Sequence, residues 1–217
     1  MSRRVRVQKI IQGLALGIAV LYWSPAMSIE EPAYTVRHTD GKLEYREYAA
    51  YLKAETLVEG AADFESAGNE GFRRLFRYIT GGNTTQSKIA MTAPVSQTGE
   101  GEKISMTVPV QQTGLSGGWL IAFTLPKQYT LETAPVPADS RVRIVSQPER
   151  LFAVLRYSGR WTESNYNESR DELLAILAAA GIAVRGEPQL ARYNAPFIPP
   201  FMRRNEVLIE VDSLPMR

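Results

Sequence analysis

The sequence predicts an α+β protein in which antiparallel strands form one curved or closed sheet and two helices pack outside it. Three observations lead to this class. Segments of alternating polarity recur along the chain from residue 29. Two longer segments, residues 63–79 and 162–180, carry apolar residues at helical spacing instead. Strands are expected on both sides of each helix, which predicts a pseudo-two-fold repeat within a single domain, residues 29–217.

The first half opens on a predicted β-hairpin. Residues 34–38 and 43–48 alternate in polarity, and Asp40-Gly41 between them is a strong hairpin turn. We expect a third strand over residues 51–57.

The helix predicted over residues 63–79 has a single apolar stripe. After it, residues 88–95 (KIAMTAPV) and 103–110 (KISMTVPV) nearly repeat one another and predict a second hairpin. Prolines 94 and 109 lack a backbone donor, so each belongs at a strand end, a bulge or an edge. The stripe of the helix consists of Phe64, Gly68, Phe72, Leu75, Phe76 and Ile79.

The second half repeats the order of strands, helix and strand. Its helix, residues 162–180, is followed by Gly181, a natural C-terminal cap. Residues 187–202 are rich in proline and aromatic residues and are expected to form a loop. The remaining strands are expected over residues 119–125, 141–146, 151–157 and 206–211.

The composition excludes several kinds of site. The chain has no Cys and one His among 217 residues, so thiolate metal sites, disulfides and sites with two imidazoles are excluded. The net charge of +2 comes from the first 28 residues, which carry four basic residues and no acid. The rest has 21 basic and 23 acidic residues, a near-neutral balance that does not indicate nucleic-acid binding.

The first 28 residues predict an export signal. A basic start precedes an apolar run over residues 10–23, and small residues suited to cleavage follow. The run is shorter than the roughly 20 residues of a membrane span, which favours a removable signal peptide. The alternative is an uncleaved inner-membrane anchor formed by residues 10–23. We therefore expect an exported protein, periplasmic in a bacterium, with N-terminal membrane association if the leader is retained.

Six short segments, in order along the chain, resemble the signature of the SOUL haem-binding family. The resemblance covers about residues 32–212 and implies a distorted eight-stranded antiparallel β-barrel flanked by two helices. It also implies similarity to the effector-binding domains of drug-responsive transcription regulators. The implied activity is non-catalytic, reversible binding of haem or related tetrapyrroles, as a carrier, buffer or sensor. The segments are YREY (45–48), YITGGN (78–83), MTAPV (91–95), MTVPV (106–110), YSGRW (157–161) and YNAPF (193–197) with RRNEV (203–207).

A tetrapyrrole site needs an apolar face, and two regions offer one. Phe72 and Phe76 lie one turn apart on the first predicted helix. Their alternative role is core packing, which is usual for an aromatic stripe at helical spacing. The proline-rich loop displays further apolar side chains, and its alternative is a loop packed shut over the end of the barrel. These loop candidates are Phe197, Ile198, Phe201 and Met202.

Cations at the rim would bind the propionates. Arg73 and Arg77 form an i, i+4 pair beside the apolar stripe, and the family resemblance favours Arg77. Their alternative is a solvated helix face. Arg203 and Arg204 are a second candidate pair, although Arg204 and Glu206 share a face of the predicted last strand and are placed to pair with each other.

The metal ligand is unknown from the sequence. The only imidazole, His38, lies in the first hairpin, away from the expected pocket, so we do not expect it to bind iron. Met91 and Met106 are expected to fill the barrel core. The remaining residues with donor atoms are Met202, Tyr78 and Tyr193.

Two other functions stay open. One is an enzyme on the same scaffold, acting on a tetrapyrrole or another apolar small molecule. That function requires converging acid and base groups, such as a buried carboxyl with a raised pKa. The other is a module that binds a protein or an amphiphile through the proline- and phenylalanine-rich loop.

Overall fold

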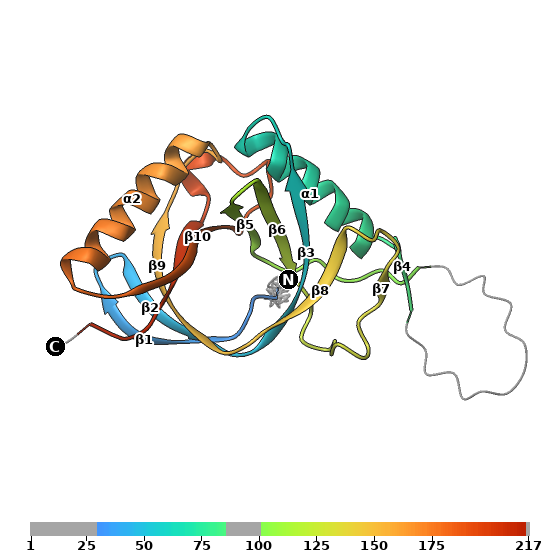
Figure 1. Ribbon diagram of the computed structural model, residues 1–217, viewed down its shortest axis with the longest axis horizontal. Coiled ribbons are helices and arrows are strands. Elements are labelled where there is room, and N and C mark those ends of the chain that lie inside the picture. Colours follow the sequence, from blue (N-terminus) through green and yellow to red (C-terminus); the bar gives the residue numbers. More distant parts are fainter. Residues whose placement is uncertain (1–29, 86–100, 216–217) are drawn as a thin grey trace, which may run out of the picture.

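A nine-stranded antiparallel sheet organises the computed structural model, which describes residues 30–85 and 101–215 (Figure 1). A separate pair is formed by the short strands β4 (Asn83–Thr84) and β7 (Val136–Pro137). The nine strands follow one another across the sheet in the order β1 (Tyr34–Asp40), β2 (Leu43–Tyr48), β9 (Arg150–Tyr157), β11 (Asn205–Val211), β10 (Val184–Arg192), β5 (Val110–Leu115), β6 (Gly118–Thr124), β3 (Tyr51–Glu59) and β8 (Val142–Gln147).

The α+β class is confirmed, with two helices flanking a curled antiparallel sheet (Figure 1). The sheet has nine strands rather than eight, and β1 and β8 are its two edges, so it is a half-barrel rather than a closed barrel. The two halves of the chain also exchange strands. β2 pairs with β9, and β3 pairs with β8, so each half of the sheet contains strands from both halves of the sequence.

The helix α1 (Phe64–Ile79) starts at a complete capping box. The Asp63 carboxylate accepts from the backbone N–H of Ser66 at 2.7 Å, and the Ser66 hydroxyl accepts from the Asp63 N–H at 3.1 Å. The helix packs on β3 and β6. Gly71 is needed for this contact, because a Cβ there would lie 2.2 Å from Cγ1 of Ile121.

The helix α2 (Glu163–Ala179) covers the other half of the sheet. Its N-cap is Thr162, whose hydroxyl accepts from the Asn165 N–H at 3.4 Å. It contacts β9, β10 and β11. Each helix therefore buries its own apolar cluster against the sheet, and a third cluster that includes Tyr48, Phe152 and Leu208 joins the strands without a helix.

The hairpin predicted over residues 88–95 and 103–110 is only partly described by the structure, and its second strand needs correction. Residues 88–95, including Met91, lie outside the described residues. Residues 103–109 are not a strand, and β5 begins at Val110. Backbone groups of this segment bond elsewhere: the Ile104 N–H donates to Ile79 O at 2.8 Å, and the Val108 N–H donates to Glu30 O at 2.9 Å.

The predicted loop over residues 187–202 is also partly wrong, because β10 occupies it up to Arg192. Pro188 lies where the register of β10 against β11 shifts, between Arg185 and Gln189, so the ladder does not need its missing N–H. A 3₁₀ turn, η1 (Pro200–Met202), follows the strand. Within the described residues, the two helices are not long and apolar enough to cross a membrane.

Candidate functional site

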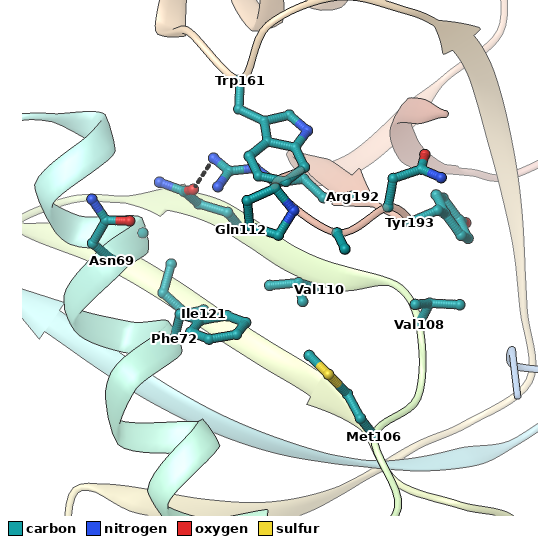
Figure 2. A pocket seen from close by; sticks show the side chains of 14 residues that line it. Asn69, Phe72, Met106, Val108, Val110, Gln112, Ile121, Trp161, Arg192 and Tyr193 are labelled. Carbon is teal, nitrogen blue, oxygen red and sulfur yellow. Dashed lines mark hydrogen bonds between the residues drawn. The ribbon is translucent and has the colours of Figure 1, made fainter. Parts of the chain in front are cut away.

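A largely apolar cavity of about 310 Å³ lies beside α1 (Figure 2). Its floor is formed by β5, β6 and the segment that leads into β5. Its far wall is formed by Trp161, which precedes α2, together with the end of β10 and the chain that follows it. The lining residues are Gly68, Asn69 and Phe72 of α1, Met106, Val108, Val110, Gln112 and Ile121 of the floor, and Trp161, Arg192, Tyr193, Asn194, Ala195 and Pro196 of the far wall.

The wall on the α1 side is made of Gly68, Asn69 and Phe72. Gly68 brings the helix close to the floor, since a Cβ there would lie 2.9 Å from Oε1 of Gln112. Phe72 packs against Phe123 with ring centroids 5.3 Å apart, and Phe76 stacks on it at 5.7 Å. The pair gives the helix an aromatic surface that starts in the cavity and continues outside it.

The indole of Trp161 is held in place from two sides. Its Nε1–H donates to Oδ1 of Asn205 at 2.8 Å. The guanidinium of Arg203 lies over its ring, 4.3 Å from the centroid. Arg203 also donates to the carbonyls of Ile198 (2.8 Å) and Pro196 (2.7 Å), so it fixes the loop after β10 against the tryptophan.

One cation, Arg192, faces the cavity. Its Nη2 donates to Oε1 of Gln112 at 2.9 Å (Figure 2). Its guanidinium lies over the rings of Phe64 (5.4 Å) and Trp161 (5.5 Å). Its Nε is buried and has no hydrogen-bond partner among the described residues. Burial lowers the pKa of Arg192 to about 10, against the opposing influence of Tyr157 and Glu65.

A buried polar network fixes Tyr193, the neighbour of Arg192. The Tyr193 hydroxyl donates to the carboxylate of Glu206 at 2.7 Å, which Arg46 also binds through two hydrogen bonds of 2.8 and 3.1 Å. The predicted pairing of Arg204 with Glu206 is confirmed at 2.9 Å. Burial raises the pKa of Glu206, but hydrogen bonds and charge from Arg46, with help from Tyr193 and Arg204, hold it below its ordinary value.

The structure places the predicted apolar residues in two groups, one at the cavity and one on an exposed loop. Phe72 lines the cavity, and Phe76 stacks on it. With exposed fractions of 37% and 44%, neither fills the core, so the core-packing alternative is wrong. Phe197, Phe201 and Met202 are more than 60% exposed, so the alternative of a loop packed shut is also wrong. The loop candidates, Ile198 included, do not line the cavity, which the loop reaches through Ala195 and Pro196.

The predicted cations do not meet at the cavity. Arg73 is exposed and pairs with Glu70 at 2.7 Å, as a solvated helix face requires. Arg77 lies near the C-terminal end of α1, where it borders a separate hollow with Asp139. Arg203 stands behind Trp161 and uses its donors on loop carbonyls, as described above.

The possible metal ligands are also spread out. His38 lies on β1, 5.7 Å from the ring of Tyr45 and outside the cavity lining. Tyr78 donates to the carbonyl of Pro135 and is buried. Met106 was expected in the core, but it is 41% exposed and lines the cavity, so that expectation is wrong.

Sequence reasoning missed Arg192, Trp161 and Gln112. Arg192 was placed in a loop because the prolines of the segment obscured the strand. The available signal is the two-residue period of a strand, which puts Leu190 and Arg192 on one face of β10. In the sequence, Trp161 stands out only as part of the YSGRW segment, which gives it no role of its own.

The cavity suits a flat apolar molecule that carries an anionic group. Its lining offers aromatic and aliphatic surface, a cation with unused donors, and the thioether of Met106 as the one soft ligand atom among the described lining residues. Those lining residues include no Asp, Glu or His, so the acid and base pair that an enzyme would need is not found among them.

Comparisons with known proteins agree with the resemblance seen in the sequence. The family model described as SOUL heme-binding protein matches residues 29–210. Heme-binding protein 1 of Xenopus laevis is 27% identical over 167 residues, covering 76% of this chain and 80% of that protein. Heme-binding protein 2 of Homo sapiens is 28% identical over 190 residues, covering 84% and 86%.

Solved structures with the same fold have far lower sequence identity. The C-terminal domain of EcmrR matches with a TM-score of 0.56 at 8% identity, over 83% of this chain and 99% of that domain. A hydrolase from Listeria innocua matches with a TM-score of 0.51 at 15% identity, over 81% and 94%. At these identities the likeness concerns the fold alone.

Proposed function

The chain belongs to the SOUL haem-binding protein family, and from this membership we propose that its cavity beside α1 binds haem or a related tetrapyrrole without catalysing a reaction. The observation that carries the proposal is the cavity itself. It is lined mainly by apolar side chains, it is open at one side, and the stacked pair of Phe72 and Phe76 continues its surface. A carrier, buffer or sensor role would use such a site for reversible binding.

The size of the cavity suggests how a tetrapyrrole is held. At about 310 Å³ it lies near the lower end of the roughly 300–1,000 Å³ range of small-molecule sites, so it encloses only part of the macrocycle. The remainder of the ring rests on Phe72 and Phe76. Haem iron brings ligand and redox chemistry with it, while these residues supply the apolar surface.

Binding by surface contact makes the iron dispensable. The described lining residues include no imidazole, and Met106 is the one sulfur-bearing side chain among them. We therefore expect haemin and iron-free protoporphyrin IX to bind with affinities within about tenfold of each other, a difference of about 1.4 kcal/mol.

The test is a titration of residues 29–217 with haemin and with protoporphyrin IX, followed by the Soret band. Phe72→Asp places a charge in the cavity wall and should weaken both ligands at least tenfold. Leu131→Asp is the matched control, because Leu131 is also half-exposed and does not line the cavity. Saturable binding that Phe72→Asp leaves unchanged would place the ligand elsewhere, and no saturable binding would refute the proposal.

We also propose that residues 1–28, outside the described part of the chain, form a cleaved export leader, with an uncleaved anchor as the alternative. Its support is the sequence pattern of a basic start, an apolar run and small residues. The mass of the protein purified from a cell envelope fraction distinguishes the two, since cleavage near Ala26 or Ser28 removes the basic start and the apolar run.

A further inference from the structure

We propose that Arg192 is the anion-binding residue of the cavity, and that the site selects flat apolar ligands that carry a carboxylate. This assigns the charged end of the ligand to a residue on β10 instead of the exposed arginines of α1. The tetrapyrrole form of the proposal rests on the proposed function, since a propionate is one such carboxylate.

The first argument is that Arg192 lacks an acidic partner. Most buried and half-buried arginines elsewhere in the described chain have an acidic partner: Arg46 and Arg204 pair with Glu206, Arg74 with Glu70 and Arg170 with Asp171. Arg203 has no acidic partner, but it uses its donors on the carbonyls of Pro196 and Ile198. Arg192 makes no ion pair with the described residues, and its one side-chain hydrogen bond goes to the neutral amide of Gln112. A desolvated cation without a counter-ion is costly unless a ligand supplies one.

The second argument is that its donors remain available. Nε has no partner among the residues described, and Nη1 makes no side-chain hydrogen bond there. A guanidinium has its donors in a fork that matches a carboxylate. The side chain of Gln112 is fixed, because its Nε2 donates to the carbonyl of Phe64 at 2.9 Å. This bond directs Oε1 of Gln112 toward Arg192.

The third argument is that the surroundings fix the guanidinium and keep it dry. The rings of Phe64 and Trp161 lie against it, and Trp161 is itself held by Asn205 and Arg203. Charge-assisted hydrogen bonds are stronger in such a low-dielectric setting than in water. An apolar body placed along Val110 and Ile121 would leave its acidic group next to Arg192, since all three side chains line the same cavity (Figure 2).

The experiment compares each acid with a neutral analogue of similar shape. Protoporphyrin IX is paired with its dimethyl ester, and 1-pyrenebutyric acid with 1-pyrenebutanol. Affinities are measured by quenching of tryptophan fluorescence in wild type, Arg192→Met, Arg192→Lys and the control Arg77→Met. Arg77 is an exposed α1 arginine outside the cavity lining, so its substitution tests the general effect of removing a positive charge.

We expect wild type and Arg77→Met to prefer each acid to its neutral analogue by at least about tenfold, the effect of one charge-assisted hydrogen bond. Arg192→Met should lose this preference while keeping its affinity for the neutral ligands, and Arg192→Lys should retain part of it. A preference that survives in Arg192→Met, or that Arg77→Met removes, overturns the proposal. Equal binding of acid and neutral analogue in wild type overturns it without any variant.

The two pairs of ligands separate this inference from the proposed function. If the pyrene acid binds with dependence on Arg192 but neither porphyrin binds, the tetrapyrrole function fails and the carboxylate site stands. If both porphyrins bind equally and no variant matters, the function stands and the carboxylate site fails. If no ligand binds, both fail.

Discussion

At the scale of single residues, Arg46 and Arg192 differ in whether an acidic side chain pairs with them. Arg46 is 4% exposed and binds Glu206 through two hydrogen bonds. Burial lowers the pKa of Arg46, but Glu206 and Tyr48 raise it above its ordinary value. Burial lowers the pKa of Arg192 to about 10, and the opposing influence of Tyr157 and Glu65 does not offset it. Arg46 therefore stabilises the fold, whereas Arg192 has no counter-ion in the fold and is the proposed partner of the ligand's carboxylate.

Replacing each arginine with methionine should separate these roles. Arg46→Met leaves the Glu206 carboxylate without its main partner and should cost about 3–5 kcal/mol in the free energy of unfolding. Arg192→Met removes an uncompensated charge and one hydrogen bond, so the free energy of unfolding should stay within about 1 kcal/mol of wild type or rise. Urea unfolding measures both values. A loss in Arg192→Met as large as that in Arg46→Met would show that Arg192 is structural.

At the scale of elements, the loop after β10 is organised by one side chain. Arg203 bonds the carbonyls of Pro196 and Ile198 and lies over Trp161, so it links the exposed loop to the cavity wall. The loop displays Phe197 and Phe201 to solvent, although apolar side chains are normally buried. The contacts of Arg203 therefore fix the loop in place, because its phenylalanine side chains are exposed and do not anchor it.

Arg203→Ala should therefore loosen this loop. We expect the amides of residues 196–203 to exchange hydrogen about tenfold faster or more, because two hydrogen bonds and the contact with Trp161 are lost. Hydrogen exchange with mass spectrometry measures this. Arg185→Ala is the control, since Arg185 is exposed, pairs with Asp212 and lies at the start of β10, whereas the loop follows the end of that strand. Unchanged exchange in the loop of Arg203→Ala would contradict its anchoring role.

At the scale of the whole molecule, the network around Glu206 connects distant parts of the chain. Arg46 reaches it from β2, Tyr193 from the end of β10, and Arg204 from beside β11. Arg204 also pairs with Glu31, which ties the N-terminal part of the described chain to the sheet. Because these elements lie far apart in the sequence, the network forms only when the sheet assembles.

The same network predicts how stability depends on pH. The pKa of Glu206 is lower in the folded protein than its ordinary value of 4.5, so its contribution is complete above pH 4.5 and is lost as the pH falls through the folded pKa. We expect the free energy of unfolding to fall below about pH 5, measured by urea unfolding at a series of pH values. Glu206→Gln should be less stable at neutral pH and should show a flatter fall. An equal slope in both proteins would mean that other carboxylates cause it.

The local pattern of the sequence determined most elements and much of the family resemblance. Both helices start one residue after their predicted first residue, because Asp63 and Thr162 are N-caps that satisfy backbone donors within one turn. Period-two alternation located β1, β2 and β9 for a similar reason, since each depends on near neighbours. The membership of the chain in the SOUL family was likewise legible from short segments, and the comparisons confirm it.

Only the tertiary structure decided the site. Phe72 and Phe76 occupy positions of an apolar stripe, and how α1 packs on β3 and β6 decides their exposure. Arg192 meets Gln112, Phe64 and Trp161 from three other parts of the chain, and its lack of an acidic partner depends on all of them. The burial of a side chain and its pairing with a charge depend on residues that are distant in the sequence. No local sequence pattern relates these residues, so only the packed sheet and helices decide both properties.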